Sequence, residues 1–182
     1  MKDRAIFLDR DGVLIRNHVR DGRPHAITFG DAVEILPGVK EACAALAKLG
    51  YRLVMISNQP DVATGATPRI FVEETNARLA GELKLDDVHV CFHDDNAACS
   101  CRKPKPGMLL EAAKHLDLDL SRSFVIGDRW RDMAAGRTAG CRTIFVNCNY
   151  REPMQEPVDV VVSSLAEAVQ WIRELTGGES PE

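Results

Sequence analysis

Several short segments of this chain are apolar at every position, whereas a half-buried strand alternates apolar and polar residues. Residues 5–8 read Ala-Ile-Phe-Leu, and residues 124–127 read Phe-Val-Ile-Gly. Strands of this kind are typical of a parallel sheet that is covered on both faces. The runs therefore predict a fold built around a buried parallel sheet.

Helical segments alternate with these strands. Segment 37–49 begins with Pro37, which suits a first helical turn, and Gly50 should end it. Ser164, with Glu167 three residues later, predicts a capping box at the start of the final helix. Repeated strand–helix units of this length predict an α/β fold, with a three-layer, doubly wound (Rossmann-like) and mostly parallel sheet. We expect strands at 5–8, 52–56, 88–92, 123–126, 142–146 and 158–162, and helices at 37–49, from 67, at 107–116, near 130–139 and from 164.

The chain has 182 residues, which is enough for one domain with a good core and too few for two. We expect one domain over 1–175 and a disordered tail at 176–182. The net charge of −4 gives no basic surface for nucleic acid. No apolar run has the length of a membrane span, and the first residues do not resemble a signal peptide. These features predict a soluble cytoplasmic protein, and its small size favours a monomer.

Acidic residues follow two of the apolar runs at the point where each strand should end. Asp9 and Asp11 follow residues 5–8, and Asp128 follows residues 124–127. Ligands of such folds bind beyond the carboxyl ends of the strands, and an acidic cluster there is costly unless a cation binds it. The pattern predicts a Mg²⁺-dependent phosphate site. Asp9 would attack phosphorus to form an aspartyl-phosphate, and Asp11 would act as the general acid and base.

The spacing of Asp9 and Asp11 supports this site. The two residues are two apart on an extended backbone, so their side chains should point the same way. Repulsion between the two carboxylates should then raise the pKa of one of them. Gly12 then allows a sharp turn. An EF-hand loop does not fit, because the glycine comes too early and a strand precedes it. For this short string alone, a pair of solvated loop carboxylates stays open as the alternative.

Polar residues at three further turns offer groups that suit a phosphate. Ser57 places a hydroxyl at a strand end, although serine is also a common turn residue. Lys103 lies in a basic segment that prolines hold extended before a helix, with a solvated turn as the alternative. Asp132, four residues after Asp128, would add a carboxylate or interact with the helix dipole.

Together, these strings resemble the four motifs of the haloacid dehalogenase (HAD) superfamily, in the order of that family and over nearly the whole chain. They are Asp9-Arg10-Asp11-Gly12-Val13, Ser57-Asn58-Gln59, Arg102-Lys103-Pro104, and Gly127-Asp128 with Asp132. The aspartate at the acid/base position implies phosphate transfer to water rather than dehalogenation. The resemblance implies a HAD-like fold and a phosphatase activity.

The resemblance also assigns a role to each motif. Asp9 resembles the nucleophile, Asp11 the general acid/base, and Lys103 the lysine that steadies the phosphoryl group. The Mg²⁺ ligands would be Asp9, the backbone carbonyl of Asp11, and Asp128, with Asp132 supporting them from behind. Substrate contacts would come from Ser57, Asn58, Gln59, Arg102 and Arg129.

Half of the cysteines fall in one short segment together with a histidine, at Cys91, His93, Cys99 and Cys101. Three thiols and one imidazole make a closed tetrahedral Zn²⁺ set, which leaves no position for water and is therefore structural. The alternatives are reduced, unligated cysteines and a zinc knuckle for nucleic acid. The knuckle is disfavoured because no aromatic or basic residues interleave the ligands. Zinc would staple the loop that carries Lys103.

The Cys-x-His…Cys-x-Cys-Arg-Lys-Pro arrangement resembles a zinc-containing branch of the superfamily, which includes D-glycero-D-manno-heptose 1,7-bisphosphate phosphatases and histidinol-phosphate phosphatases. It implies hydrolysis of a small phosphorylated sugar in carbohydrate metabolism, first of all heptose 1,7-bisphosphate. Histidinol phosphate or another sugar phosphate is the alternative substrate, and a non-catalytic zinc-stapled binding module is the alternative of another class. Connections 11–37 and 57–67 are expected to be loops without room for a folded cap. Residues 20–25, in the first of them, are expected to form a surface loop, although they are polar enough to face substrate.

One loop departs from the heptose phosphatases. They typically carry a sequence resembling Ser-Gly-Ile-Ala-Arg-Gly, whereas this chain has Pro60-Asp61-Val62-Ala63-Thr64-Gly65. The arginine is missing, and Asp61 adds a negative charge near the expected entrance. A second substrate phosphate is disfavoured there unless another cation compensates, the candidates being Arg69, Arg102 and Arg129.

Overall fold

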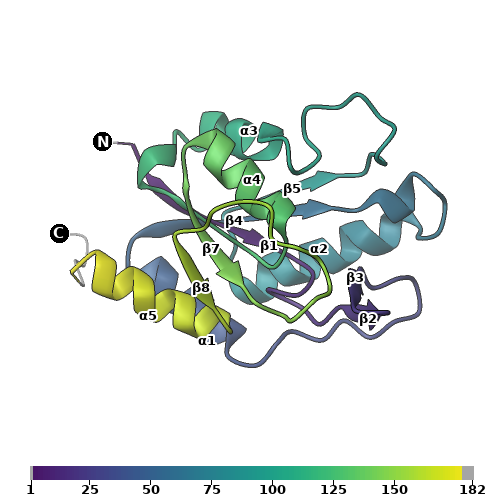
Figure 1. The fold of residues 1–182 in the computed structure, drawn as a ribbon, viewed down its shortest axis with the longest axis horizontal. Helices are drawn as coiled ribbons and strands as arrows, with labels where there is room; N and C mark the ends of the chain where they lie inside the picture. Colours follow the sequence, from purple (N-terminus) through teal and green to yellow (C-terminus); the bar gives the residue numbers. More distant parts are fainter. Residues whose placement is uncertain (1, 178–182) are drawn as a thin grey trace.

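The computed structural model of the protein describes residues 2–177. These residues form one six-stranded sheet in the order β5-β4-β1-β6-β7-β8, in which all neighbouring strands are parallel (Figure 1). The predicted parallel sheet is therefore confirmed. Its strands are β1 (Arg4–Asp9), β4 (Tyr51–Asn58), β5 (Asp87–Cys91), β6 (Phe124–Gly127), β7 (Arg142–Val146) and β8 (Val160–Val162).

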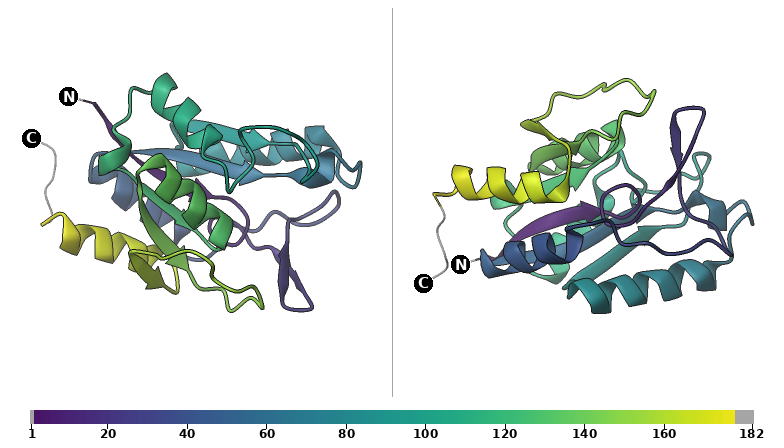
Figure 2. Two further views of the ribbon diagram at one scale, coloured as in Figure 1. Left: turned by 45° about the horizontal axis from the view of Figure 1, so that its top comes forward. Right: turned by 90° about the horizontal axis from the view of Figure 1, so that it is seen from below.

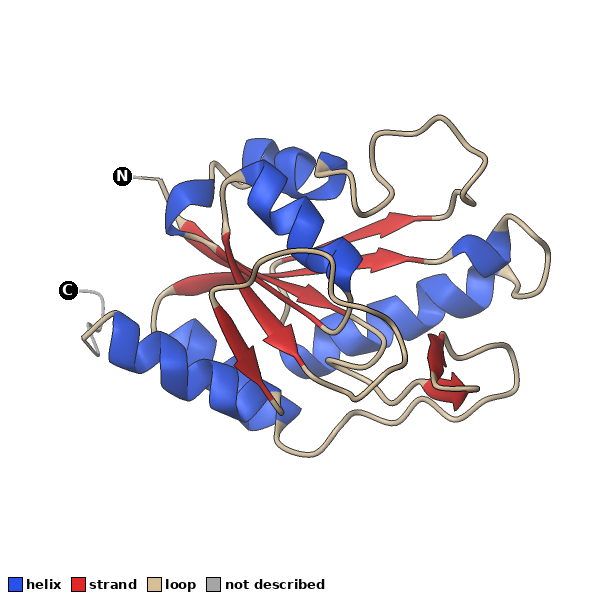
Figure 3. Cartoon of the chain, in the orientation of Figure 1, coloured by secondary structure: helices blue, strands red, loops and turns tan. Residues whose placement is uncertain are grey.

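Helices cover both faces of this sheet (Figure 3). They are α1 (Val39–Lys48), α2 (Arg69–Leu83), α3 (Gly107–His115), α4 (Trp130–Ala139) and α5 (Leu165–Leu175). Helices α1, α2 and α5 contribute side chains to the core on one face, whereas α3 and α4 contribute to the core on the other. The predicted three-layer α/β fold is confirmed.

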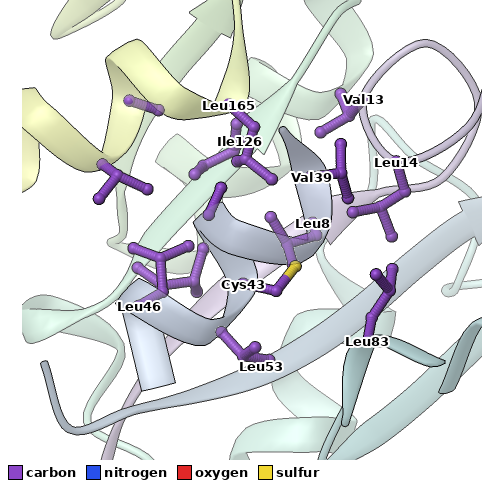
Figure 4. Close-up of a cluster of buried hydrophobic side chains, with 14 of the residues drawn as sticks. Leu8, Val13, Leu14, Val39, Cys43, Leu46, Leu53, Leu83, Ile126 and Leu165 are labelled. Carbon is purple, nitrogen blue, oxygen red and sulfur yellow. The ribbon is translucent and has the colours of Figure 1, made fainter. Parts of the chain in front are cut away.

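The central strand β1 is fixed by packing from both sides. Leu8 (Figure 4) and Ile6 belong to the core cluster under α1 and α5, whereas Phe7 and Ala5 belong to the cluster under α3 and α4. All four side chains are 0 % exposed. Full burial of a large apolar side chain stabilises a fold by about 1.5–3 kcal/mol. The strand that ends in Asp9 is therefore a rigid support for that residue.

Two helix starts differ in detail from the sequence-based expectation. Helix α1 begins at Val39 rather than Pro37, because Gly38 has a φ of 76° and this left-handed conformation interrupts the helical run. At α5, the Ser164 hydroxyl accepts a hydrogen bond from the Glu167 N–H at 3.3 Å, as predicted. The Glu167 carboxylate instead binds the N–H and hydroxyl of Ser163, both at 2.7 Å, because that residue offers two donors.

The connection between β1 and α1 is not the plain loop that we expected. It contains an antiparallel hairpin of β2 (His18–Arg20) and β3 (Arg23–His25), which projects from the body of the molecule (Figure 2). Asp21 and Gly22 join the strands with φ values of 52° and 75°. An Asp-Gly pair favours this tight turn, so the sequence did contain a signal for the hairpin.

The remaining connections add little structure. The segment after β4 forms a single 3₁₀ turn at Pro60–Val62. Within residues 2–177, no helix has both the length and the apolar character that crossing a membrane requires. Most of the expected tail, residues 178–182, lies outside the described residues.

Candidate active site

The predicted site residues lie where the carboxyl ends of β4, β1 and β6 meet at one edge of the sheet. Asp9 is the last residue of β1, Ser57 is the penultimate residue of β4, and Asp128 directly follows β6. The register places Asp9 opposite Ile56 of β4. A cavity of about 240 Å³ opens at this edge, and its lining includes Asp9, Asp11, Ser57, Lys103 and Asp132.

Three buried carboxylates and one ammonium group form the centre of the site. Carboxylate oxygens of Asp9, Asp128 and Asp132 lie within 4.8 Å of one another. The Lys103 Nζ lies 2.6 Å from Oδ1 of Asp9 and 2.6 Å from Oδ1 of Asp132, and it donates to the carbonyl of Ile56 at 3.1 Å. Since one ammonium faces three carboxylates, this group of described residues keeps an excess of negative charge.

Burial and mutual repulsion make these carboxylates hard to ionise together. Burial raises the pKa of Asp9 to about 6; Lys103 opposes this shift and Asp132 adds to it. The pKa of Asp128 lies well above its ordinary value, because of burial first and then of the charges on Asp9 and Asp132. Burial alone would lower the pKa of Lys103, but the charges of Asp132 and Asp9 hold it above its ordinary value. Such a group needs additional positive charge.

The Asp128 carboxylate provides a test of whether a cation fits. Its Oδ2 accepts a hydrogen bond from the Tyr150 hydroxyl at 2.8 Å, whereas its buried Oδ1 has no hydrogen-bond partner in the described part of the chain. Gly12, with a φ of 90°, passes so close that a side chain at this position would collide with the same carboxylate. An orphaned oxygen within an acidic cluster fits Mg²⁺, which prefers oxygen ligands.

The Asp11 carboxylate lies outside this cluster, because other side chains hold it. Arg10 donates to it through Nε at 2.9 Å and Nη2 at 3.2 Å, and Gln59 donates through Nε2 at 2.8 Å. The expected repulsion between Asp9 and Asp11 is therefore only a small part of what raises the pKa of Asp9. Burial is the main cause of the raised Asp9 pKa, and Asp132 contributes more to it than Asp11 does. The resemblance assigns the backbone carbonyl of Asp11, and not this carboxylate, to a metal.

Arg10 is completely buried, and the sequence pattern gave it no role. In addition to its two bonds with Asp11, it donates through Nη1 to Oδ1 of Asn76 in α2 at 3.1 Å. A buried guanidinium is costly unless it is paired and hydrogen-bonded. Arg10 therefore fixes Asp11 relative to α2. The only trace of this in the sequence is a positive charge between two aspartates.

The Ser57-Asn58-Gln59 turn departs from the expectation that all three residues contact substrate. The Ser57 hydroxyl borders the cavity and accepts a hydrogen bond from Gln59 at 2.8 Å. Gln59 is 2 % exposed, and its amide donates to Asp11 and Ser57. Asn58 reaches the cavity wall, but its amide bonds the backbone carbonyl and N–H of Lys103 at 3.0 and 3.1 Å. Gln59 and Asn58 therefore position neighbouring site residues, because their polar atoms are already engaged.

Three arginines of the described chain border the cavity, and two of them were predicted. Arg102 donates to Asp95 at 2.8 Å, and Arg129 forms a two-bond ion pair with Glu152 at 2.9 and 2.6 Å. Both thus already hold a carboxylate. The third is Arg131, in the first turn of α4. Sequence reasoning missed it because an arginine at a helix start usually faces solvent.

The hairpin and the loop after β4 complete the cavity wall. Asp61 borders the cavity, as expected. Pro24 and His25 border it too, so the segment 20–25 that we expected to be a surface loop reaches the site. Arg69 is not part of this wall, because its guanidinium stacks above the Phe92 ring at 4.5 Å. It cannot compensate for the missing loop arginine.

The loop between β5 and α3 gathers four possible metal ligands. The Cys91 Sγ lies 3.8 Å from the Cys99 Sγ and 3.5 Å from Nδ1 of His93, and the Cys101 Sγ lies 3.4 Å from the same nitrogen. A tetrahedron with Zn–S bonds of ~2.3 Å has edges of about 3.8 Å, so this spacing fits four-coordinate zinc. Burial raises the pKa of the Cys91 thiol to about 12, so that this thiol needs a metal to ionise at neutral pH.

Two contacts hold this loop against the start of α3. Lys105 donates through Nζ to the Cys99 carbonyl at 2.5 Å. Gly107, the first residue of α3, passes so close to the Ser100 carbonyl that a side chain would collide with it. In the sequence, Lys103 lies between Cys101 and Lys105. The contacts that hold the loop against α3 therefore also restrict the backbone of Lys103.

Comparisons with known proteins agree with this geometry. A family model described as HAD-hydrolase-like matches residues 100–168. A D-glycero-beta-D-manno-heptose-1,7-bisphosphate 7-phosphatase from Photorhabdus laumondii is 34% identical over 188 residues, covering 93% of this chain and 95% of that protein. The protein of the same name from Escherichia coli K12 is 34% identical, covering 93% of each chain.

Solved structures show the same likeness. The D,D-heptose 1,7-bisphosphate phosphatase from B. bronchiseptica, in complex with magnesium and phosphate, has a TM-score of 0.78 and 28% identity, covering 94% of this chain and 99% of that one. A HAD-like phosphatase from Mesorhizobium loti has a TM-score of 0.75 and 27% identity, covering 96% and 88%. Since the similarity to named phosphatases spans almost the full length of each protein, the chain belongs to the HAD-like family of phosphatases.

Proposed function

We propose that the protein is a Mg²⁺-dependent phosphomonoester hydrolase that removes the 7-phosphate of D-glycero-D-manno-heptose 1,7-bisphosphate. One observation carries the proposal, namely the buried cluster of Asp9, Asp128 and Asp132, whose charge Lys103 balances only in part. The cluster lies at the edge of the sheet where such folds bind ligands. Relatives at 34% identity are named for this reaction, which supports the choice of substrate.

Each residue has a step that its position supports. The Asp9 oxygen that Lys103 does not hold attacks phosphorus, and the bond to the sugar oxygen breaks as Asp11 donates a proton to that oxygen. Asp11 then takes a proton from water, which attacks the aspartyl-phosphate, releases phosphate and restores Asp9. Lys103 and Ser57 bind the oxygens of the phosphoryl group. Mg²⁺, held by Asp9, Asp128 and the Asp11 carbonyl, would supply the charge neutralisation that phosphoryl transfer needs.

Zinc at the loop between β5 and α3 would be structural. Four protein ligands leave no open coordination position for water or substrate. By holding the loop, zinc would fix the backbone that carries Arg102 and Lys103. The proposed ligands are Cys91, His93, Cys99 and Cys101.

We further propose a single domain over residues 1–175, acting as a monomer in the cytoplasm and in carbohydrate metabolism. A cavity of about 240 Å³ suits a small phosphorylated metabolite. One feature favours a different substrate. Asp61 adds a negative charge to the cavity wall, which would suit histidinol phosphate, with its single phosphate and its amino group, better than a bisphosphate.

Replacement of the nucleophile tests the activity. Asp9→Asn should reduce hydrolysis of p-nitrophenyl phosphate by at least about 1,000-fold, since a carboxamide does not attack phosphorus. Chelation of Mg²⁺ should abolish the wild-type activity. The matched control is Asp117→Asn, at a carboxylate that is 78% exposed and pairs with Lys2, and it should stay fully active. Beryllofluoride should add to Asp9 in a crystal; an adduct elsewhere, or an active Asp9→Asn variant, would refute the mechanism.

Relative kcat/KM values test the substrate. Heptose 1,7-bisphosphate should give the highest value in a panel that also contains histidinol phosphate and common sugar monophosphates. A higher value for histidinol phosphate would replace the heptose assignment and leave the phosphatase mechanism intact.

A further inference from the structure

The three arginines that border the cavity differ in how fully they are paired. Arg129 donates through Nε and Nη2 to the two oxygens of the Glu152 carboxylate, at 2.9 and 2.6 Å, so it has one counter-charge of its own. Arg102 and Arg131 instead share one carboxylate oxygen, Oδ1 of Asp95, at 2.8 and 3.1 Å. Two cations that meet at one anion have capacity for more negative charge. Arg102 and Arg131 are therefore the positions where an additional anion is most favoured.

The two guanidinium groups are preorganised. Arg102 has a side chain that is 11% exposed, and it donates through Nη1 to the His93 carbonyl at 3.1 Å. Arg131 lies above the ring of Trp130 at 5.4 Å, and its buried Nε lacks a hydrogen-bond partner within residues 2–177. Little side-chain entropy is then lost when they bind an anion.

Their shared partner, Asp95, is in a different environment. Its side chain is 69% exposed, and it lies in the loop between His93 and Cys99 rather than on a helix or strand. Both guanidinium groups donate to its Oδ1. Asp95 thus bridges two cavity arginines with a side chain that is itself largely in solvent.

We propose that Arg131, together with Arg102, binds the distal phosphate of a doubly phosphorylated substrate, and that Asp95 fills this position until substrate displaces it. The proposal rests on the proposed function for the scissile phosphate, which Lys103 and Ser57 bind in the same cavity. A phosphate brings up to two negative charges and three acceptor oxygens, whereas Asp95 brings one charge and binds through a single oxygen. Arg131 and Asp95 are then residues that determine specificity for a bisphosphate.

The two arginines would compensate for the positive charge that the 60–65 loop lacks. Asp61 makes that side of the cavity unfavourable for a second phosphate, and Arg69 is turned away towards Phe92. Arg131 supplies a positive charge from a different segment, the first turn of α4. The substrate class that fits is therefore a sugar with a second anionic group beyond the scissile phosphate.

The test is a cycle of two ligands and four proteins. The ligands are heptose 1,7-bisphosphate and heptose 7-phosphate, which differ only in the distal phosphate. The proteins are the wild type, Arg131→Gln, Asp95→Asn and the control Arg137→Gln, an exposed arginine in the last turn of the same helix. Steady-state kcat/KM is measured for each pair. Calorimetric Kd values are measured in an Asp9→Asn background with Mg²⁺, so that the binding result does not depend on turnover.

The readout is the ratio of kcat/KM for the bisphosphate to kcat/KM for the monophosphate, together with the corresponding ratio of Kd values. Arg131→Gln should reduce the preference for the bisphosphate by about 10- to 100-fold, mainly through KM, and should leave the monophosphate unchanged. Asp95→Asn should increase the preference, because the competing carboxylate is gone, and Arg137→Gln should change nothing. An unchanged ratio in Arg131→Gln, or an equal loss for both ligands, would overturn the anion site. An unchanged or lower ratio in Asp95→Asn would overturn the role of Asp95.

Failure of the proposed function would look different. In that case the wild type would hydrolyse neither sugar phosphate nor p-nitrophenyl phosphate, while the Kd ratios would still report on Arg131. Zinc content and melting temperature of each variant identify a loop that is merely disrupted, since such a defect would affect both ligands alike.

Discussion

Lys103 is the residue on which the charges of the site converge. Its ammonium group contacts Asp9, Asp132 and the carbonyl of Ile56 at distances of 2.6, 2.6 and 3.1 Å. Without it, two carboxylates would be buried without a counter-charge, which costs several kcal/mol. Even with it, Asp128 keeps an orphaned oxygen among the residues described. Lys103 therefore neutralises only part of the acidic cluster, and the remaining negative charge favours binding of a cation.

The raised pKa of Asp9 predicts how Mg²⁺ binding depends on pH. Without metal, burial and the other effects described above hold this pKa at about 6. Because a carboxylate must ionise to bind metal, apparent Mg²⁺ affinity should fall by up to about tenfold per pH unit below ~6. The folded pKa is the higher one, so this group favours the metal-free fold below its unfolded value of 3.8, and that contribution is lost as the pH rises through about 6. The increase in melting temperature on adding Mg²⁺ should therefore be larger at pH 7 than at pH 5.

Calorimetric titration and thermal melts between pH 5 and 8 measure both effects. Asp9→Asn, which cannot ionise at this position, is the matched variant and should lose the step near pH 6. Equal Mg²⁺ shifts at pH 5 and pH 7 in the wild type would contradict the prediction.

Arg10 predicts a positioning effect on catalysis. A lysine at this position keeps the charge but lacks the planar fork that binds both oxygens of Asp11. Arg10→Lys should reduce kcat by about 10- to 100-fold with little change in KM, since Asp11 acts in the transition state. Asn76→Ala, which removes one bond, should have a smaller effect. Steady-state kinetics with pH profiles measure this.

A control on α2, the helix that carries Asn76, separates an effect on the position of Asp11 from an effect on stability. Arg78→Lys alters an exposed ion pair with Glu82 on α2 and should leave kcat and its pH profile unchanged. If Arg10→Lys lowered only the melting temperature, with kcat intact, Arg10 would serve packing alone.

At the scale of the elements, the loop between β5 and α3 links a possible metal centre to the active site. Lys103 lies two residues after Cys101 and is held from the other side by Asn58. The loop carries no regular structure between Cys91 and Gly107, so its shape depends on the four ligands and on a few hydrogen bonds. Zinc would replace the missing secondary structure as the constraint on this segment.

Removal of one proposed zinc ligand tests whether the shape of this loop depends on zinc. Cys99→Ser should abolish stoichiometric zinc, lower the melting temperature by at least about 5 °C and lower kcat, because the Lys103 backbone loses its constraint. The matched control is Cys141→Ser, a buried cysteine outside the cluster, which should lose stability but retain zinc. Elemental analysis, thermal melts and kinetics measure the three effects. A Cys99→Ser protein with the wild-type melting temperature and no zinc would contradict a structural role.

The elements also show how far the sequence could predict the structure. Helix α4 has the predicted bounds, because its pattern and its flanking glycine both signal them. The hairpin β2–β3 was missed because strands of only three residues carry no detectable periodicity, although their Asp-Gly turn was visible. In the site, the strand-end aspartates were predictable from position. Arg10 and Arg131 were not, because their roles depend on partners that lie far away in the sequence, Asn76 and Asp95.

At the scale of the whole molecule, the site depends on one sheet that is packed on both faces. The residues at the centre of the site come from β1, from the loop before α3 and from the start of α4. They meet because the parallel strands all end at the same side of the sheet. Strands β1 and β4 contribute alternate residues to both core clusters. Neither face can therefore unfold while the other stays intact, since they share the same backbone.

This coupling predicts a single unfolding transition, whichever face is weakened. Phe7→Ala removes a side chain from the face of α3 and α4, and Leu8→Ala removes one from the face of α1 and α5. Each should cost about 2–5 kcal/mol and lower the melting temperature by roughly 4–20 °C. In scanning calorimetry, each variant should keep one transition whose calorimetric and van't Hoff enthalpies agree. A second transition in either variant would mean that the two faces are separate cooperative units, and the Asp9 strand between them would then lose the rigidity that the proposed chemistry requires.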